Sequence, residues 1–218
     1  MTTLSQLRTN ARSRADMPST TFVTNAELNT WLNEGIAIVH DKLVAAYGGD
    51  YLESTASFTT DGSEYLDLPN DFYKLQGIDL VNGGTTYTLQ PFTGSERNLY
   101  ANLHSAAWPT LPKYKFSGAD RIRLAPIPTS GLAGVIWYIP KATTLSGDAD
   151  TVSFPNGWER YAVVYAAIQM LMKEESDPTQ LQMLLARWDM ELKDMFDNRD
   201  AGMARKTVDV DSIDNWWP

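Results

Sequence analysis

The sequence predicts an α+β protein: a small helical bundle with one long early helix and two late helices, a large antiparallel β-rich insertion, and an extended C-terminal tail. Three observations support this prediction. Apolar residues recur at helical spacing near both ends of the chain, the middle alternates with a period of two, and the last residues follow neither period. The predicted helical domain is discontinuous and covers 1–50 and 157–202, with the insertion over 51–156 and the tail over 203–218.

The early helical part begins with a segment over 4–15, whose apolar residues recur at helical spacing. A long helix follows over about 25–47, and a capping box marks its start. The hydroxyl of Thr24 can accept from the backbone N–H of Glu27, whose carboxylate reaches back. Gly48-Gly49 ends this helix. Its apolar face consists of Leu28, Trp31, Leu32, Ile36, Val39 and Leu43.

Strands are expected between residues 51 and 140, where turn residues separate short alternating segments. The predicted hairpins span 57–68, 75–89 and 114–124. Asp61-Gly62 suits the positive φ of the first turn. A further strand is predicted over 135–139 and a short helix over 95–103. Hairpin connections of this kind imply an antiparallel sheet without parallel crossovers.

Helical spacing returns after a linker rich in Gly, Asp and Thr over 141–156. One late helix is predicted over 157–175, and Pro178 opens the next, which runs towards Arg199. Aromatic residues on these helices have the spacing of packing positions and are interpreted as core: Tyr161, Tyr165 and Trp188.

Composition sets the class of molecule. The chain has 218 residues, 43% of them hydrophobic, which suffices for a packed core. It contains no cysteine, so disulfides, thiolate catalysis and thiolate metal sites are excluded. The sequence has neither the apolar core of a signal peptide nor an apolar run of the ~20 residues that span a bilayer. We therefore expect a soluble protein that is made in a cytoplasm.

The formal net charge of the chain is −9. Proteins that bind nucleic acid by neutralising phosphates need clustered Lys and Arg, so this charge argues against that mode. It fits two interpretations: ordinary solubility, which is favoured, or a surface that does not adhere to DNA passing nearby.

No group of residues in the sequence predicts a catalytic, cofactor or metal site. His40 and His104 lack the spacing of metal-binding pairs, so each is interpreted as a surface or interface histidine. The sequence also lacks a nucleophile elbow, a dinucleotide fingerprint and a phosphate-binding loop. We expect a protein that is not an enzyme; the rival is a hydrolase acting through carboxylates of the insertion.

The tail ends in Trp216-Trp217, two side chains that are costly to leave in water. A terminal segment lacks local neighbours to bury them, so a groove on a partner or on a neighbouring copy is the favoured destination. Asp209, Asp211 and Asp214 recur just before. They suit a solvated or partner-facing strand better than a metal site, which needs more convergent oxygens.

Four basic residues alternate with apolar residues on the third predicted hairpin: Lys113, Lys115, Arg121 and Arg123. One face of this hairpin is therefore cationic and the other apolar, as expected for an antiparallel pair with a wet face and a buried face. Three interpretations stay open for the cationic face. It is a plain exposed surface, a contact with another subunit, or a contact with nucleic acid, for which four charges make a weak footprint.

Several stretches occur in a characteristic order along the chain. They are Leu7-Arg8-x3-Arg12-x-Arg14-x-Asp16, the stretch from Thr24-Asn25-Ala26-Glu27 to Glu34, Leu68-Pro69-Asn70-Asp71-Phe72-Tyr73-Lys74-Leu75, Glu96-Arg97-Asn98, Ile122-Arg123-Leu124-Ala125-Pro126-x-Pro128, Trp137-Tyr138-Ile139-Pro140, and Ala166-Ala167-Ile168 with Lys173-Glu174-Glu175-Ser176-Asp177. In these stretches and their order, the chain resembles the head-to-tail adaptor (connector) proteins of tailed bacteriophages and gene transfer agents.

The resemblance implies a structural virion protein at the head–tail interface, made in the host bacterial cytoplasm. Such adaptors form a ring, commonly twelve-fold, beneath the portal protein of the head, extend the DNA channel and join the head to the tail. Double-stranded DNA would pass through without specific binding, and no membrane would be involved. The rival within the virion is a tail-side protein, a terminator or nozzle component, that binds the tail alone.

The resemblance also assigns roles to the parts of the chain. The helical bundle would build the ring with neighbouring copies, and the insertion would bind tail components, such as nozzle or terminator proteins, or neighbouring adaptors. The C-terminal segment would dock on the portal protein. The residues expected to dock are Val208, Asp209, Val210, Asp211, Ile213, Asp214, Trp216 and Trp217.

Overall fold

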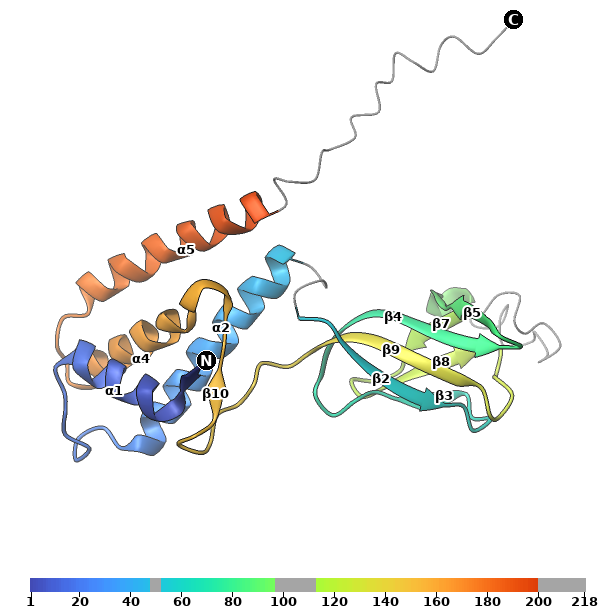
Figure 1. Cartoon of the computed structure of the whole chain (residues 1–218), viewed down its shortest axis with the longest axis horizontal. Helices are drawn as coiled ribbons and strands as arrows, with labels where there is room; N and C mark the ends of the chain where they lie inside the picture. Colours follow the sequence, from blue (N-terminus) through green and yellow to red (C-terminus); the bar gives the residue numbers. More distant parts are fainter. Residues whose placement is uncertain (48–51, 97–112, 200–218) are drawn as a thin grey trace, which may run out of the picture. The chain divides into compact units, whose positions relative to one another are not determined.

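The computed structural model describes residues 1–47, 52–96 and 113–199. The chain divides into two compact units. One, here called the helical unit, comprises Met1–Lys42 and Leu145–Pro218, and the other, the sandwich unit, comprises Leu43–Thr144. The predicted α+β class is confirmed: helices and antiparallel strands occupy different parts of the chain (Figure 1).

The described part of the chain contains four α-helices where the sequence predicts them. They are α1 (Leu4–Ala15), α2 (Asn25–Tyr47), α4 (Glu159–Lys173) and α5 (Thr179–Arg199). The predicted capping box of α2 is present, because the backbone N–H of Glu27 donates to the Thr24 hydroxyl at 3.2 Å and the Glu27 carboxylate accepts from the Thr24 backbone N–H at 2.9 Å.

The helical unit is held by apolar faces that meet at close range. Leu4 and Leu7 of α1 and Leu28 and Leu32 of α2 are fully buried. The α2 backbone approaches α4 closely at Gly35, where a Cβ atom would lie 2.7 Å from the Cα atom of Ala162. The two helices can approach so closely because the buried residues of α4 here are small. They are Ala162, Ala166 and Ala167, all fully buried.

A two-stranded sheet joins the chain start to the segment before α4. Its strands are β1 (Thr2–Thr3) and β10 (Thr151–Val152), paired antiparallel. The Asn33 side chain donates to the Leu145 carbonyl at 3.0 Å and accepts from its N–H at 2.9 Å. The predicted boundary at 156/157 therefore falls too late, because these bonds bring the chain back to the helical unit at Leu145. A short 3₁₀ turn, η3 (Pro155–Gly157), leads into α4.

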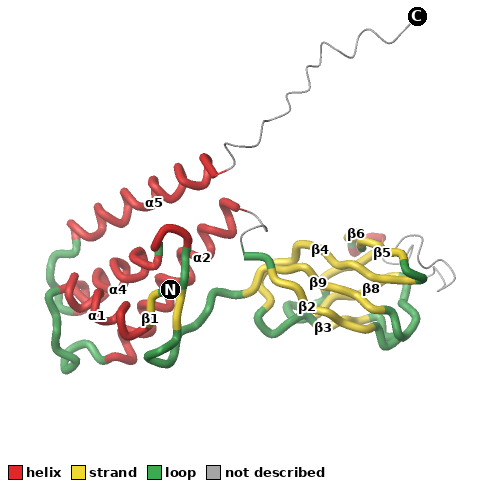
Figure 2. Tube along the Cα trace, in the orientation of Figure 1, coloured by secondary structure: helices red, strands yellow, loops and turns green. Residues whose placement is uncertain are grey.

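The sandwich unit contains two four-stranded sheets (Figure 2). One has the order β2 (Ser54–Thr59), β9 (Ala133–Pro140), β4 (Phe72–Asn82) and β5 (Thr85–Thr88). The other has the order β3 (Tyr65–Asp67), β8 (Arg121–Ala125), β7 (Lys113–Phe116) and β6 (Gln90–Pro91). The strand predicted over 135–139 is β9, and it is central in its sheet.

Both sheets contribute alternate residues to one apolar core. This core consists of Leu68, Ile78, Leu80, Leu89, Ile122, Leu124, Ile136 and Tyr138. Because side chains of a strand alternate between its faces, the period of two in the sequence places six of these residues on the inner faces of the two sheets, and Leu68 and Leu89 directly follow β3 and β5.

Two of the three predicted hairpins are confirmed. β4 and β5 pair with Asn82 opposite Thr85, and both glycines of the two-residue turn between them have positive φ, as a tight hairpin turn requires. β7 and β8 pair with Phe116 opposite Ile122.

The predicted hairpin over 57–68 is wrong. β2 pairs with β9, whereas β3 pairs with β8 in the other sheet. The chain crosses between the sheets after Thr60, whose hydroxyl donates to the Thr129 carbonyl at 2.6 Å and accepts from the Leu132 N–H at 2.9 Å. Asp61-Gly62 therefore lies in the connection between the two sheets. β2 and β3 do not pair with each other, because pairing in separate sheets lets both strands bury their apolar faces in one core.

The expectation of a purely antiparallel sheet is also wrong at one place. β6 pairs with β7 in parallel, Gln90 opposite Lys113 and Pro91 opposite Tyr114. Parallel neighbours need a long connection, and the chain between these strands is long enough to provide one. Of the helix predicted over 95–103, the described residues form a 3₁₀ turn, η1 (Gly94–Glu96); residues 97–103 lie outside the described part.

Candidate partner-binding surfaces

The residues expected to dock on a portal protein, Val208 to Trp217, lie outside the described residues, as does His104. His40, predicted to be a surface or interface histidine, lies on α2 and is 5% exposed, so the surface alternative is wrong. Its neighbour Asp41 approaches the ring at 3.8 Å. Within the described ranges, no three His, Asp or Glu side chains are grouped so as to hold a metal ion.

The cationic hairpin is formed by β7 and β8, with Lys115 directly opposite Arg123. Ile122 and Leu124 are buried on the inner face, whereas Arg121 is exposed on the outer face. The predicted division into a wet cationic face and an apolar face is therefore confirmed for β8. On β7 it is less complete, because Phe116 is 44% exposed.

Acidic and aromatic side chains accompany the cations of this hairpin. Arg123 forms an ion pair with Glu64 at 3.0 Å. The guanidinium of Arg121 lies 3.8 Å from Asp120 and 5.8 Å from the ring centroid of Tyr65. The backbone and hydroxyl of Thr93 lower the pKa of Glu96, and the nearby charge of Lys113 lowers it further. The outer face is thus a mixed-charge surface, a poor match for a phosphate backbone and a suitable one for protein.

Sequence reasoning missed a second surface, on the helical unit. Two arginines stack on two tryptophans there: the Arg160 guanidinium lies 4.5 Å from the Trp158 ring centroid and 4.8 Å from that of Trp188. Arg14 of α1 lies 5.7 Å from the Trp188 centroid. The two indoles meet edge to face at 6.2 Å and are buried, while both arginines are exposed.

These arginines border a cavity of about 440 Å³ between α1 and α4. Its lining also includes Leu7, Asn10 and Glu159. Thr2 donates its hydroxyl to one carboxylate oxygen of Glu159 at 2.7 Å. The other oxygen is buried and accepts no hydrogen bond from the described residues. We call this site, formed by Arg14, Trp158, Glu159, Arg160 and Trp188, the arginine groove.

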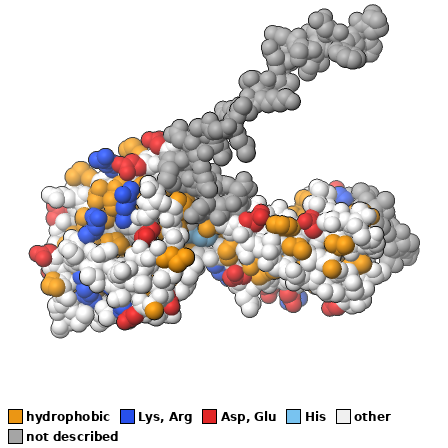
Figure 3. All heavy atoms as spheres, viewed as in Figure 1, with side chains coloured by type: hydrophobic (Ala, Val, Ile, Leu, Met, Phe, Trp, Pro, Cys, Tyr) orange, Lys and Arg blue, Asp and Glu red, His pale blue; other side chains and the backbone are white. Residues whose placement is uncertain are grey.

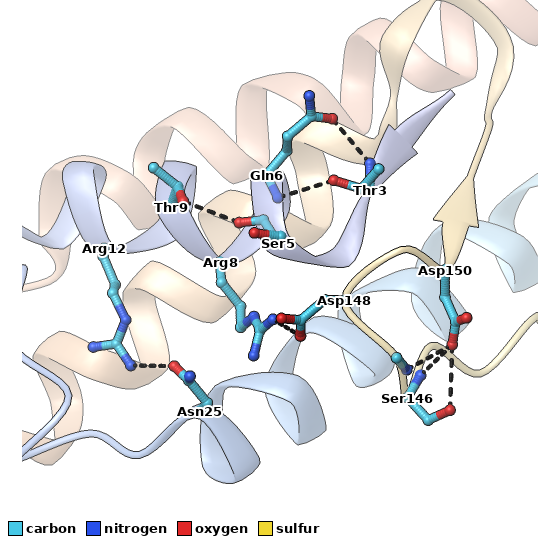
Figure 4. A network of polar contacts seen from close by, with 11 residues as sticks. Thr3, Ser5, Gln6, Arg8, Thr9, Arg12, Asn25, Ser146, Asp148 and Asp150 are labelled. Atoms are coloured by element: carbon cyan, nitrogen blue, oxygen red, sulfur yellow. Dashed lines mark hydrogen bonds and ion pairs between the residues drawn. The ribbon is translucent and has the colours of Figure 1, made fainter.

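The other two arginines of α1 are used inside the helical unit (Figure 4). Arg8 pairs with Asp148. Arg12 is buried and donates to the carbonyls of Ser19 at 2.6 Å and Val23 at 2.8 Å. Arg14 differs, because no carboxylate of the described part forms an ion pair with it or with Arg160. Figure 3 shows Lys and Arg side chains lying against hydrophobic ones on this unit.

An acidic surface lies at the connection between α4 and α5. Glu174, Glu175 and Asp177 are all exposed there. The hydroxyl and N–H of Thr179 donate to Asp177 and lower its pKa, so this carboxylate is ionised at neutral pH. Met172, 54% exposed, lies beside them. We call these four residues the acidic corner.

The only lysine in this stretch of chain, Lys173, is already engaged. It forms an ion pair with Glu27 at 2.7 Å and donates to the Phe22 carbonyl at 2.9 Å. The charge of the acidic corner is therefore not cancelled by its sequence neighbour.

The chain thus has two compact units that carry charged and aromatic surfaces. The sequence model of the SU10 adaptor protein family matches residues 2–211, which span both units. The chain therefore belongs to the SU10 adaptor protein family, a family of structural bacteriophage adaptors and not of enzymes. A comparison with curated proteins gives no match. In the described ranges, no helix is both long and apolar enough to cross a bilayer.

Proposed function

We propose that this protein is a head-to-tail adaptor that forms a ring beneath the portal protein, extends the DNA channel and joins the head to the tail. The family match over residues 2–211 carries the proposal, because it covers the helical unit and the sandwich unit together. The protein acts as a component of the virion, and its partners are the portal protein, neighbouring copies and tail proteins.

Each part of the chain has a proposed role. The helical unit builds the ring, commonly of twelve copies in such assemblies. The mixed-charge face of β7 and β8 suits contact with a tail protein or with a neighbouring subunit, because its Arg, Lys, Asp and Glu side chains can exchange partners across an interface. Double-stranded DNA passes through the ring without specific binding, in keeping with the net charge of −9.

The tail is proposed to dock on the portal protein through two groups of residues. The alternating Val208-Asp209-Val210-Asp211 lies within the family match, whereas Trp216 and Trp217 lie after it. Two indoles inserted in a portal groove would bury a large apolar area and act as the anchor.

Co-sedimentation with portal-containing heads tests the proposal. The full chain, a version ending at Asp211 and a version ending at Gly202 are each mixed with heads, and the bound fraction is measured. We expect the full chain to bind, the Asp211 version to bind more weakly, and the Gly202 version not to bind. Circular dichroism of each version controls for folding.

The other outcomes are equally informative. Equal binding by all three versions removes the docking role of the tail and leaves the adaptor role. If no version binds heads but the full chain binds isolated tails, the protein is a tail-side component such as a terminator or nozzle protein, and the head-side proposal fails.

A further inference from the structure

We propose that the arginine groove of one copy binds the acidic corner of the next copy, and that this head-to-tail contact closes the ring. The inference rests on the proposed ring. It adds the surfaces that make the subunit contact and the polarity of that contact.

The groove is suited to carboxylates. Arg14 and Arg160 lie over buried indoles, which hold the guanidinium planes in place while their N–H groups remain available. A guanidinium binds a carboxylate through two parallel N–H···O bonds, and prior immobilisation lowers the entropy cost of that contact. Across the described residues, no acidic side chain neutralises either arginine.

Glu159 adds a requirement for a donor. One of its oxygens accepts from Thr2, and the other is buried without a hydrogen bond in the described structure. A buried carboxylate oxygen without a donor is unfavourable. The occupant of the groove should therefore bring an N–H or O–H donor together with its carboxylates, as a peptide segment does.

The acidic corner meets these requirements. It offers three exposed carboxylates and, among the described residues of the α4–α5 connection, the backbone N–H of Asp177, whereas the Ser176 hydroxyl already donates to Glu174 at 2.8 Å. The apolar side chain of Met172 beside them can cover the rim of the groove. Because Lys173 is held by Glu27, the corner presents a net negative charge to a neighbour.

The two surfaces lie at opposite ends of the same helix. Arg160 is in the first turn of α4 and Glu174 follows its last residue, about 20 Å away at 1.5 Å per residue. A surface that binds a different surface of an identical copy makes a heterologous contact, which closes into a ring when the rotation between copies allows it. A two-fold dimer would instead form the same groove–corner contact twice across its axis, and its mass distinguishes it from a ring.

Charge reversal tests the pairing. The groove-reversed variant R14E/R160E has two acidic surfaces, and the corner-reversed variant E174K/E175K has two basic surfaces. Assembly is measured by sedimentation velocity and native mass spectrometry of the full chain, alone and on portal-containing heads. We expect each variant alone to assemble about tenfold or more weakly than the wild type, because every contact then joins like charges.

Assembly of a mixture of the two variants decides whether the groove and the corner contact each other. In a 1:1 mixture, each groove can meet a corner of opposite charge, so we expect ring assembly to recover with the two variants alternating. The ring then contains an equal number of each variant, which native mass spectrometry resolves. The matched control K74E/K141E reverses two exposed lysines of the sandwich unit and should assemble like the wild type. Circular dichroism and thermal melting establish that each variant is folded.

The failures are distinguishable. If folded variants assemble alone as well as the wild type, or if their mixture does not recover, the pairing is overturned and the adaptor role stands. If the wild type forms no ring in solution or on heads, the proposed ring fails, and the pairing fails with it.

Discussion

Arg12 is the residue that most directly fixes the entry into the long helix α2. Its guanidinium donates to the carbonyls of Ser19 and Val23 and, at 3.0 Å, to the side-chain oxygen of Asn25, the first residue of α2. Burial lowers its pKa, and the charge of Arg8 lowers it further. One side chain thus satisfies several backbone groups of the connection between α1 and α2.

We predict that Arg12→Lys destabilises the protein by about 1–3 kcal/mol, because an ammonium cannot reach three acceptors in the planar arrangement of a guanidinium. Urea unfolding followed by far-UV circular dichroism measures the change. Arg187→Lys, at an exposed pair with Glu191, is the matched control and should be nearly neutral. A loss no larger than that of the control would contradict the role assigned to Arg12.

A pH effect is expected at Glu27. Hydrogen bonds from Lys173 and from Thr24 lower its pKa from 4.5 to about 2. Because the folded-state pKa is the lower one, the stabilisation is present above the unfolded-state value and is lost as the pH falls through the folded-state value. The melting temperature should therefore fall between pH 5 and pH 2 more steeply in the wild type than in Glu27→Gln. If the melting temperature of both proteins fell equally steeply with pH across that range, the prediction would be refuted.

At the scale of elements, α2 and α4 approach each other closely at Gly35. We predict that Gly35→Ala destabilises the protein by about 1–3 kcal/mol, although alanine is the better helix former, because its Cβ would force the two helices apart. Gly77→Ala is the control, since a Cβ there meets nothing within 4 Å. Chemical unfolding of both variants measures the difference; a neutral Gly35→Ala would show that α2 can shift without cost.

Short-range sequence patterns predicted the positions of the helices correctly, but they predicted the strand pairing only in part. Capping and spacing determined α2, because both act within a few residues, and Thr24 with Glu27 needs no distant partner. The crossing at Asp61-Gly62 could not be distinguished from a hairpin, because both need the same turn residues. The choice between them depends on β8 and β9, which lie 55 or more residues further along the chain.

The arginine groove was out of reach of sequence reasoning for the same reason. Arg14 and Arg160 are far apart in the sequence, and neither has a neighbour that suggests a shared site. The cationic hairpin could be predicted because its residues are adjacent. Its acidic partner Glu64 could not, since it comes from the segment before β3.

For the whole molecule, two units with separate cores should respond separately to core substitutions. Ile136 is 2% exposed in the sandwich core, whereas Gly35 belongs to the helical unit. We predict that Ile136→Ala, expected to cost about 2–5 kcal/mol, lowers one thermal transition, and that Gly35→Ala lowers a different one. Differential scanning calorimetry makes the test. A single transition that both substitutions shift equally would indicate one cooperative unit.

The hydrogen bond between Thr2 and Glu159 joins residues 157 positions apart in the chain. During synthesis on the ribosome, α1 and α2 therefore emerge long before α4. Their apolar faces lack the α4 part of the core until the whole sandwich unit has been synthesised. The sandwich unit can complete its own core first. The helical unit then closes after the sandwich unit, once α4 has joined α1 and α2, so the surfaces shared by α1 and α4 form only at that stage.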